Sequence, residues 1–252
     1  MKLNLDLLVK GLAVTLILMQ PSPGLAFSSS DGQGGKVHAE ITEEGLRGTI
    51  GSSNLKLIID ANEAQDKKES EGAKDSRRHF AAKTVESALS YIDREKKSAL
   101  NYACEADTDQ ESRANALRHF GMLLHSAQDF YSQSNYVELS LKGPQFRGDP
   151  LQIPLVDWSR VPGGYDGLVA NAADSLDNAV NFSKDNPTTD QGKKVAGKTT
   201  YYNIARELAI RETQRQWALF ETLIRNRCGD RAPKIIAALK QASPDVKVSS
   251  QD

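Results

Sequence analysis

The chain has 252 residues and a formal net charge of −1, because 32 lysines and arginines nearly balance 33 aspartates and glutamates. This balance argues against a nucleic-acid-binding protein, which usually carries a strong basic excess. The length is enough for one domain with its own hydrophobic core. Nothing in the composition specifies an oligomeric state.

Residues 1–26 have the pattern of a secretory signal peptide. Lys2 and Lys10 supply a basic start, a short apolar run follows, and small residues precede the predicted cleavage site after Ala26. The apolar run is about half of the ~20 residues that a membrane-spanning helix needs. We therefore predict an exported protein, secreted or periplasmic, with a retained amino-terminal anchor as the alternative.

Two cysteines, Cys104 and Cys228, are the whole complement of the chain. In an oxidising compartment an even pair of cysteines is a candidate disulfide. The alternative is two buried thiols that never meet. We predict the bridge, which would tie the middle of the chain to its last long helix.

Helical patterns dominate the chain after the signal peptide. A Ser/Gly-rich flexible leader is expected over residues 27–36, and a polar tail over residues 242–252. Between them the spacing of apolar residues predicts helices over 37–47, 55–65, 79–102, 112–141, 165–182, 199–227 and 233–241. Loops are expected over 67–78, over 143–164 (held to the body by Trp158) and over 183–198. No run alternates as a strand would, so we predict an all-α, single-domain multi-helix bundle over residues 37–241.

His125 and Asp129 are the most informative pair in this pattern. They stand four residues apart on a predicted helix, so their side chains project from one face about a turn apart. One divalent cation could take both an imidazole nitrogen and a carboxylate oxygen there. Gln133, the next position on that face, is a neutral amide and a weaker ligand.

The other histidines extend this idea. His38 and His79 stand at predicted element starts, beside acidic residues. Helical bundles build metal sites by bringing side chains of several helices together, and zinc accepts mixtures of imidazole and carboxylate ligands. His119 lies about 120° around the helix from His125, so we expect it to have a structural or supporting role instead.

A longer motif around this pair resembles a known family. The run Gly121 to Asn135, with Gly-x-x-Leu-His-x-x-Gln-Asp-Phe-Tyr-Ser-x-Ser-Asn, is similar to the hallmark of the Het-C (heterokaryon incompatibility) proteins, which are in turn related to zinc-dependent phospholipase C. Shorter pieces fit in the same order along the chain. They are residues 38–46, Asn62 and Asp66 followed by His79-Phe80, and the later helix through residues 205–217.

The resemblance implies a helical fold of the zinc-dependent phospholipase C type and a phosphodiester-cleaving site. Metal ions would activate a water and neutralise the phosphate of a phospholipid, at a membrane surface or elsewhere. The implied metal ligands are His38, Asp66, His79, His125 and Asp129, and Asp66 is also the implied general base. Asp60 is the rival of Asp66 in this alignment.

The chain also departs from the family pattern. Gln133 and Ala81 replace a histidine and an aspartate that many relatives have, and no histidine follows His125. We therefore expect one or two zinc ions instead of three, with Glu207 or Glu138 completing a ligand shell. Two functions remain open: an exported metal-dependent phosphodiesterase, or a non-catalytic helical scaffold for recognition at the cell surface or envelope.

Overall fold

The computed structural model describes residues 36–67, 75–80, 85–143, 146, 148–161, 167–170 and 182–241. Six predictions fall wholly or largely outside these residues: the signal peptide 1–26, the leader 27–36 apart from Lys36, most of the loop 67–78, the departure at Ala81, most of the helix 165–182, and the tail 242–252.

The described part of the chain is mostly helical, which confirms the all-α prediction. Its α-helices are α1 (Lys36–Leu46), α2 (Ser52–Glu63), α4 (Val85–Ala103), α5 (Gln110–Gln133), α6 (Tyr136–Lys142), α8 (Tyr201–Cys228) and α9 (Ala232–Lys240). Two short 3₁₀ turns, η1 (Pro150–Gln152) and η2 (Gly229–Arg231), accompany them. The strands β1 (Val195–Ala196) and β2 (Thr199–Thr200) pair antiparallel, with Val195 opposite Thr200. None of the described helices is long and apolar enough to cross a membrane.

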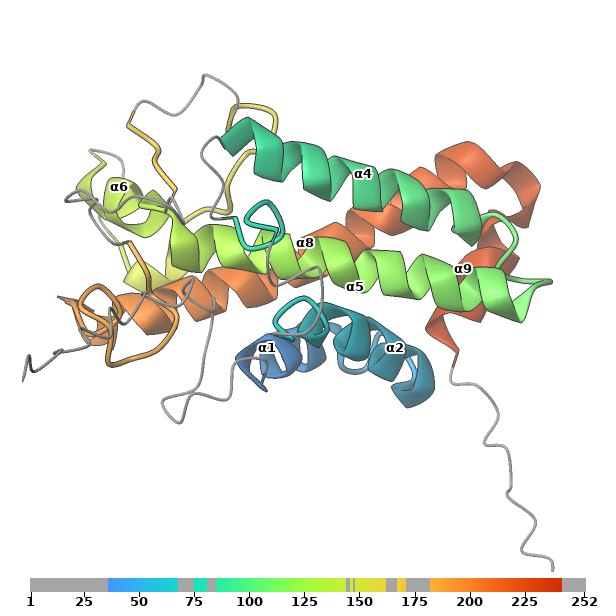
Figure 1. The fold of residues 1–252 in the computed structure, drawn as a ribbon, viewed down its shortest axis with the longest axis horizontal. Helices are drawn as coiled ribbons and strands as arrows, with labels where there is room; N and C mark the ends of the chain where they lie inside the picture. Colours follow the sequence, from blue (N-terminus) through green and yellow to red (C-terminus); the bar gives the residue numbers. More distant parts are fainter. Residues whose placement is uncertain are drawn as a thin grey trace, which may run out of the picture.

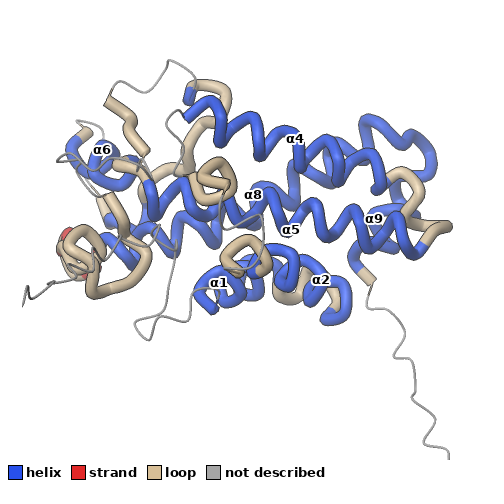
Figure 2. The backbone as a smooth tube through the Cα atoms, viewed as in Figure 1, coloured by secondary structure: helices blue, strands red, loops and turns tan. Residues whose placement is uncertain are grey.

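Helix α5 lies at the centre of the molecule (Figures 1 and 2). It contacts α4 along one side, α1 and α2 along another, and α8 behind it. From Leu123 to Gln133 every residue of α5 is buried. A helix that is buried all round has no solvent-facing stripe, so its polar side chains must find partners inside the protein. Polar groups on this half of α5 are therefore the natural place to look for a site.

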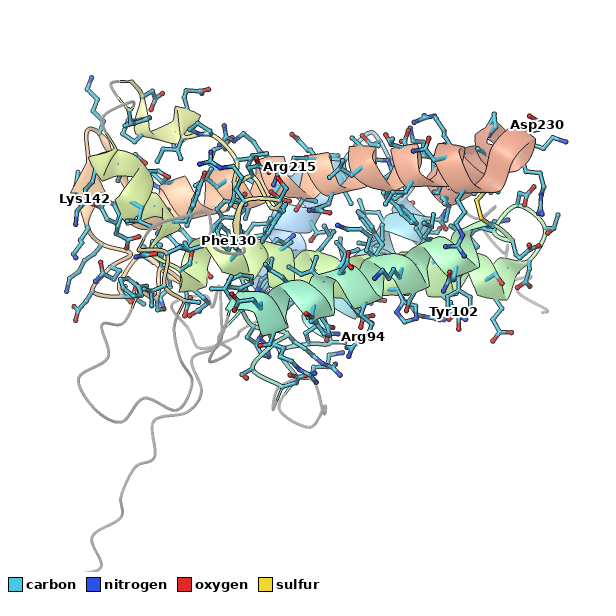
Figure 3. All side chains as sticks on the ribbon, turned by 90° about the horizontal axis from the view of Figure 1, so that it is seen from above. Arg94, Tyr102, Phe130, Lys142, Arg215 and Asp230 are labelled. Atoms are coloured by element: carbon cyan, nitrogen blue, oxygen red, sulfur yellow. A yellow bond between two sulfur atoms is a disulfide. The ribbon has the colours of Figure 1, made fainter. Side chains whose placement is uncertain are left out.

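Two apolar clusters flank this polar interior. One gathers Phe120, Trp217 and Phe220 with residues of α2, α4 and α9. The other surrounds Phe130 and includes Phe80, Tyr131 and Trp158. The disulfide Cys104–Cys228, with its Cα atoms 5.5 Å apart, joins the ends of α4 and α8, as predicted (Figure 3). This bond is consistent with export to an oxidising compartment.

The predicted helix 112–141 is two helices. Ser134 is extended (φ −118°, ψ 167°) and pairs with Ala170, while the Asn135 side chain accepts from the Val169 amide and donates to the Gly167 carbonyl. These non-local hydrogen bonds draw the backbone out of the helix, so α5 ends at Gln133. Local apolar spacing carries no sign of them.

Other element predictions need correction. His79 lies in a turn and Phe80 after it has a φ of 48°, so these two residues do not begin the predicted helix 79–102, of which α4 is Val85–Ala103. Residues 167–170 are not helical, contrary to the predicted helix 165–182. The connector 183–198 contains β1, which is too short for a periodicity to reveal.

Candidate metal centre

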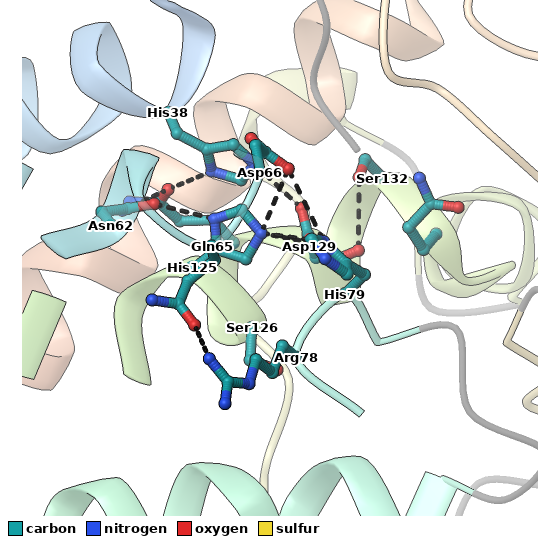
Figure 4. A network of polar contacts seen from close by, with 12 residues as sticks. His38, Asn62, Gln65, Asp66, Arg78, His79, His125, Ser126, Asp129 and Ser132 are labelled. Atoms are coloured by element: carbon teal, nitrogen blue, oxygen red, sulfur yellow. Dashed lines mark hydrogen bonds and ion pairs between the residues drawn. The ribbon is translucent and has the colours of Figure 1, made fainter. Parts of the chain in front are cut away.

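Five side chains from four parts of the chain meet beside the buried half of α5 (Figure 4). They are His38 of α1, Asp66 just beyond α2, His79 of the turn before α4, and His125 and Asp129 of α5. His38, His125 and Asp129 are fully buried, and Asp66 and His79 are 5% and 6% exposed. These are the five residues expected from the sequence as metal ligands. The fold therefore brings the whole predicted set into one cluster.

Five of the six donor-atom separations among four of these residues lie near those of a tetrahedral ligand set. His79 Nδ1 lies 3.0 Å from His125 Nε2 and 3.6 Å from both Asp66 Oδ1 and Asp129 Oδ2. His125 Nε2 lies 3.6 Å from Asp66 Oδ1 and 3.3 Å from Asp129 Oδ2. Zinc bonds of about 2.0–2.2 Å place tetrahedral ligand atoms about 3.3–3.6 Å apart. The cluster could therefore hold a metal ion with little rearrangement.

His38 occupies a different place in the cluster. Its Nε2 contacts the other oxygen of Asp129, Oδ1, at 3.1 Å, and its ring lies tilted by 33° against that of His125, with centroids 4.2 Å apart. It also belongs, with Asp66 and His125, to a second group of three donor atoms near enough to share an ion. This position lets His38 either hold Asp129 in place or contribute to a second ion.

Hydrogen bonds turn two imidazoles toward the centre of the cluster. His125 donates from Nδ1 to Asn62 Oδ1 at 2.9 Å, and His38 donates from Nδ1 to Gln128 Oε1 at 2.7 Å. In both rings this leaves Nε2 facing the carboxylates. Metal-binding histidines are commonly oriented in this way by a partner on the other ring nitrogen.

The orienting amides are themselves held by a polar network. Asn62 Nδ2 donates to Thr42 Oγ1 and to Gln128 Oε1, and Gln128 Nε2 donates to Thr42 Oγ1 and Thr213 Oγ1. The network links α1, α2, α5 and α8. Sequence reasoning assigned no role to Gln128, Thr42 or Thr213. The only signal was that these three residues and Asn62 all stand inside the family-like motifs.

The carboxylates of the cluster lack hydrogen-bond donors. Both oxygens of Asp66 and both oxygens of Asp129 are buried and accept no hydrogen bond. A buried carboxylate without donors is costly unless a cation compensates it. The imidazole nitrogens of His38, His79 and His125 lie 3.1 to 3.6 Å from these oxygens, near enough for both kinds of group to bind a common ion.

The electrostatics of the cluster favour positive charge between the carboxylates. Burial disfavours a charged His38, but Asp129 and Asp66 outweigh it and raise the pKa of His38 to about 9. Burial, together with the neighbouring Asp129, raises the pKa of Asp66 to about 6. Burial and the charge of His38 lower the pKa of His125 well below its usual value, so this ring is neutral and able to bind a metal.

The close packing of α2 on α5 positions the Asn62 and Asp66 end of the cluster. A Cβ on Gly121 would lie 2.3 Å from the carbonyl oxygen of Ile58 and 3.0 Å from the Cβ of Ala61. Only glycine permits this approach. The glycine that opens the motif therefore brings α2 near enough for Asn62 to reach His125.

Several predicted residues lie outside the cluster. Asp60 is exposed and pairs with Lys56 at 2.7 Å, so it is not the alternative to Asp66. Glu138 pairs with buried Lys184, and Glu207 lies beside Arg211. The prediction that one of these two glutamates completes a ligand shell is therefore wrong. His119 bonds Glu95 at 2.7 Å and stacks on Tyr102, in keeping with its predicted structural role.

Gln133 lies one turn beyond Asp129 and turns to a different partner. Its amide nitrogen donates to Asp185 Oδ1 at 2.5 Å. Burial raises the pKa of Asp185 to about 7, and the Asp129 carboxylate adds to this effect. The connector that carries Asp185 thus covers the carboxyl end of α5. No pattern in the sequence indicated this contact.

Comparison with known proteins identifies a similarity over part of the chain. A family model described as the VWA7 N-terminal domain matches residues 37–152, a segment that contains all five residues of the cluster. This comparison identifies no Het-C or phospholipase C family. No curated protein and no solved structure matches the chain.

Proposed function

We propose that this chain is a metal-binding helical domain in which Asp66, His79, His125 and Asp129 hold one zinc ion. The proposal rests on the spacing of their four donor atoms, five of whose six separations are 3.0 to 3.6 Å. His38 holds the second oxygen of Asp129. A second ion, if present, would share His38 and the remaining carboxylate oxygens.

The burial of this site favours a structural role for the ion. Structural zinc sites have four protein ligands, whereas catalytic sites leave one position for water. All four ligands are at most 6% exposed, and they come from α5, from the end of α2 and from the turn before α4. A zinc ion there would tie these segments together. We infer a stable scaffold in an exported protein, suited to recognition at a cell surface or envelope.

The test is metal analysis of the purified mature protein combined with thermal unfolding. We expect one zinc per chain, a lower unfolding temperature after chelation, and recovery when zinc is returned. Asp129→Asn should lose the metal, and the exposed Asp60→Asn should keep it. A folded protein that contains no metal and does not respond to added zinc contradicts the proposal.

A second candidate function is phosphodiester hydrolysis of the phospholipase C type. Asp66 and His79 are the two cluster residues that keep some exposure, and a carboxyl group with a pKa of about 6 is suited to general base catalysis near neutral pH. The bound metal would supply Lewis-acid chemistry toward the phosphate and a water of lowered pKa. In this function Asp66 would accept the proton of the attacking water.

This candidate is tested with the zinc-loaded protein and a chromogenic phosphocholine ester. Turnover that is lost in Asp66→Asn and kept in Asp60→Asn supports the enzyme. Zinc-loaded protein without turnover on this ester or on phospholipid vesicles excludes it and leaves the scaffold function in place.

A further inference from the structure

His79 differs from the rest of the metal cluster in how its backbone is held. The other four residues of the cluster lie on α1, on α5 or just beyond α2. His79 lies in the turn of residues 75–80, which belongs to no helix or strand. A helix fixes the backbone of its residues by its own hydrogen bonds, whereas a turn needs other contacts to bring an imidazole to a given point.

The imidazole of His79 also lacks the kind of hydrogen bond that orients the other two rings. His125 and His38 each donate from Nδ1 to a side-chain amide. In His79 it is Nδ1 that faces the carboxylates, and the other nitrogen, Nε2, is buried and bonds to none of the described residues. Ligand histidines are commonly oriented through this second nitrogen. The place of the His79 ring therefore depends on the backbone that carries it.

Two hydrogen bonds hold the turn on the side that precedes His79. The Ser126 hydroxyl of α5 donates to the Arg77 carbonyl at 2.9 Å. Arg78 donates from Nη1 to Gln65 Oε1 at 2.9 Å (Figure 4). These bonds tie the turn to α5 and to the segment just beyond α2. They hold the chain as far as Arg78, so the residue after His79 decides which way the histidine faces.

Phe80 holds the turn on the side that follows His79. Its side chain is fully buried, and its ring lies edge to face with Phe130 and beside Trp158, with centroids 5.0 and 6.3 Å away. Its φ of 48° is in the left-handed region, which bulky residues rarely adopt because Cβ meets the backbone. Such a conformation persists only where surrounding contacts compensate its strain, often at ligand sites. The aromatic contacts of Phe80 supply this compensation.

The aromatic partners of Phe80 are themselves firmly held. Trp158 donates from its ring nitrogen to Glu212 Oε1 at 2.8 Å, and its ring packs on Phe130 with centroids 4.9 Å apart. Glu212 is fully buried on α8. A continuous path of contacts therefore runs from α8 through Trp158 and Phe80 to His79.

We propose that Phe80 is a positioning residue of the metal centre and links this centre to the loop that carries Trp158. The buried Phe80 ring holds the left-handed turn that places His79 Nδ1 beside the other donor atoms. The link is reciprocal, because an ion that binds better when Phe80 is packed also stabilises that packing. Metal binding therefore tightens the contact of Phe80 with Trp158. This inference rests on the zinc binding proposed above.

Zinc affinities of core variants test the positioning, with competition by a zinc-binding dye as the measurement and circular dichroism as the check on folding. Phe80→Ala should weaken zinc binding by about 10–100-fold. Phe220→Ala removes an equally buried ring from the other apolar cluster and should change the affinity by no more than about twofold. Phe80→Leu, which keeps a buried apolar side chain, should bind zinc more tightly than Phe80→Ala. Unchanged affinity in Phe80→Ala, or an equal loss in Phe220→Ala, overturns the proposal.

The fluorescence of Trp158 gives a second test that needs no change at Phe80. Trp217→Phe leaves Trp158 as the one tryptophan of the chain. Zinc has a filled d shell and no redox chemistry, so a change in emission on zinc binding reports on packing. We expect a saturable change in emission and slower quenching by acrylamide, both complete at one zinc per chain.

The outcomes separate this inference from the metal site itself. Zinc bound at one per chain with unchanged Trp158 emission and quenching overturns the link and leaves the metal site in place. A wild-type chain that binds no zinc contradicts both the metal site and the role of Phe80.

Discussion

His79 Nδ1 and His125 Nε2 lie 3.0 Å apart inside the protein. Two lone pairs at this distance repel each other, so a proton or a metal cation must lie between the two nitrogens. The two rings are nearly perpendicular, with centroids 4.9 Å apart. Asp66 Oδ1 and Asp129 Oδ2 lie 3.6 and 3.3 Å from the same nitrogen, His125 Nε2. A metal ion bound there would join the turn of residues 75–80 to α5, and this relationship underlies the first predictions.

Replacing His125 should remove the metal without unfolding the domain. We expect His125→Ala to lose bound zinc and the stabilisation that zinc provides, about 4 kcal/mol when zinc is at 1,000 times its dissociation constant. The matched control is His119→Ala on the same helix, whose side chain bonds Glu95. Thermal unfolding with zinc and with chelator measures both. Equal losses in the two variants would contradict the assignment.

His38 should affect zinc affinity less than Asp129 does. Because His38 contacts the second oxygen of Asp129, we expect His38→Ala to weaken zinc binding by about 10–100-fold, the usual effect of losing an outer partner. Asp129→Ala should abolish binding. Competition with a zinc-binding dye measures both affinities. If His38→Ala also abolishes binding, His38 is a direct ligand and the set of four is wrong.

Gly121 should tolerate no larger residue. An added methyl group would collide with the backbone of Ile58, so α2 must move away from α5. We expect Gly121→Ala to lower the free energy of unfolding by about 1–3 kcal/mol and to weaken zinc binding. Gly148→Ala, which would meet no atom within 4 Å, is the control. Urea unfolding and zinc titration test this, and an unchanged Gly121 variant would show that the helices can separate freely.

Glu212 should be essential to the packing of the Trp158 loop. This fully buried carboxylate accepts from Tyr131, Trp158, Gln216 and Arg215. Glu212→Ala leaves these donors unpaired, and we expect a loss of about 3–5 kcal/mol in urea unfolding. Glu207→Ala on the same helix, where the side chain is 39% exposed, should change stability by less than about 0.5 kcal/mol. Similar values for the two variants would argue against the network.

Asp185 should make the metal-free protein less stable as the pH rises. Its pKa is about 7 in the folded protein, against about 3.9 in an unfolded chain, so the folded state binds more protons between these values. Its stabilising contribution is complete near pH 4 and is lost as the pH rises through 7, by up to about 4 kcal/mol. Urea unfolding in chelator across this range should show a steeper decline for the wild type than for Asp185→Asn. A decline of equal slope in both would exclude Asp185 as its source.

Local patterns in the sequence predicted most of the helices, because a helix makes its backbone hydrogen bonds within its own segment. The four-residue spacing of His125 and Asp129 placed both side chains on one face of α5, as the structure has them. The Cys104–Cys228 disulfide was predicted from composition and compartment, and it is present. The break at Ser134 could not be predicted, because it depends on hydrogen bonds from Asn135 to residues 167 and 169.

The sequence by itself determined that the chain is helical, that its histidines and acidic residues suit a metal, and that Asp66 or Asp60 belongs with them. Only the tertiary structure decided between the two aspartates, placed His38 on the far oxygen of Asp129, and directed Gln133 to Asp185. The reason is that spacing along one helix specifies a face, whereas the partners of that face come from segments about 50 to 90 residues away. Their approach depends on close packing, as at Gly121, which no local pattern encodes.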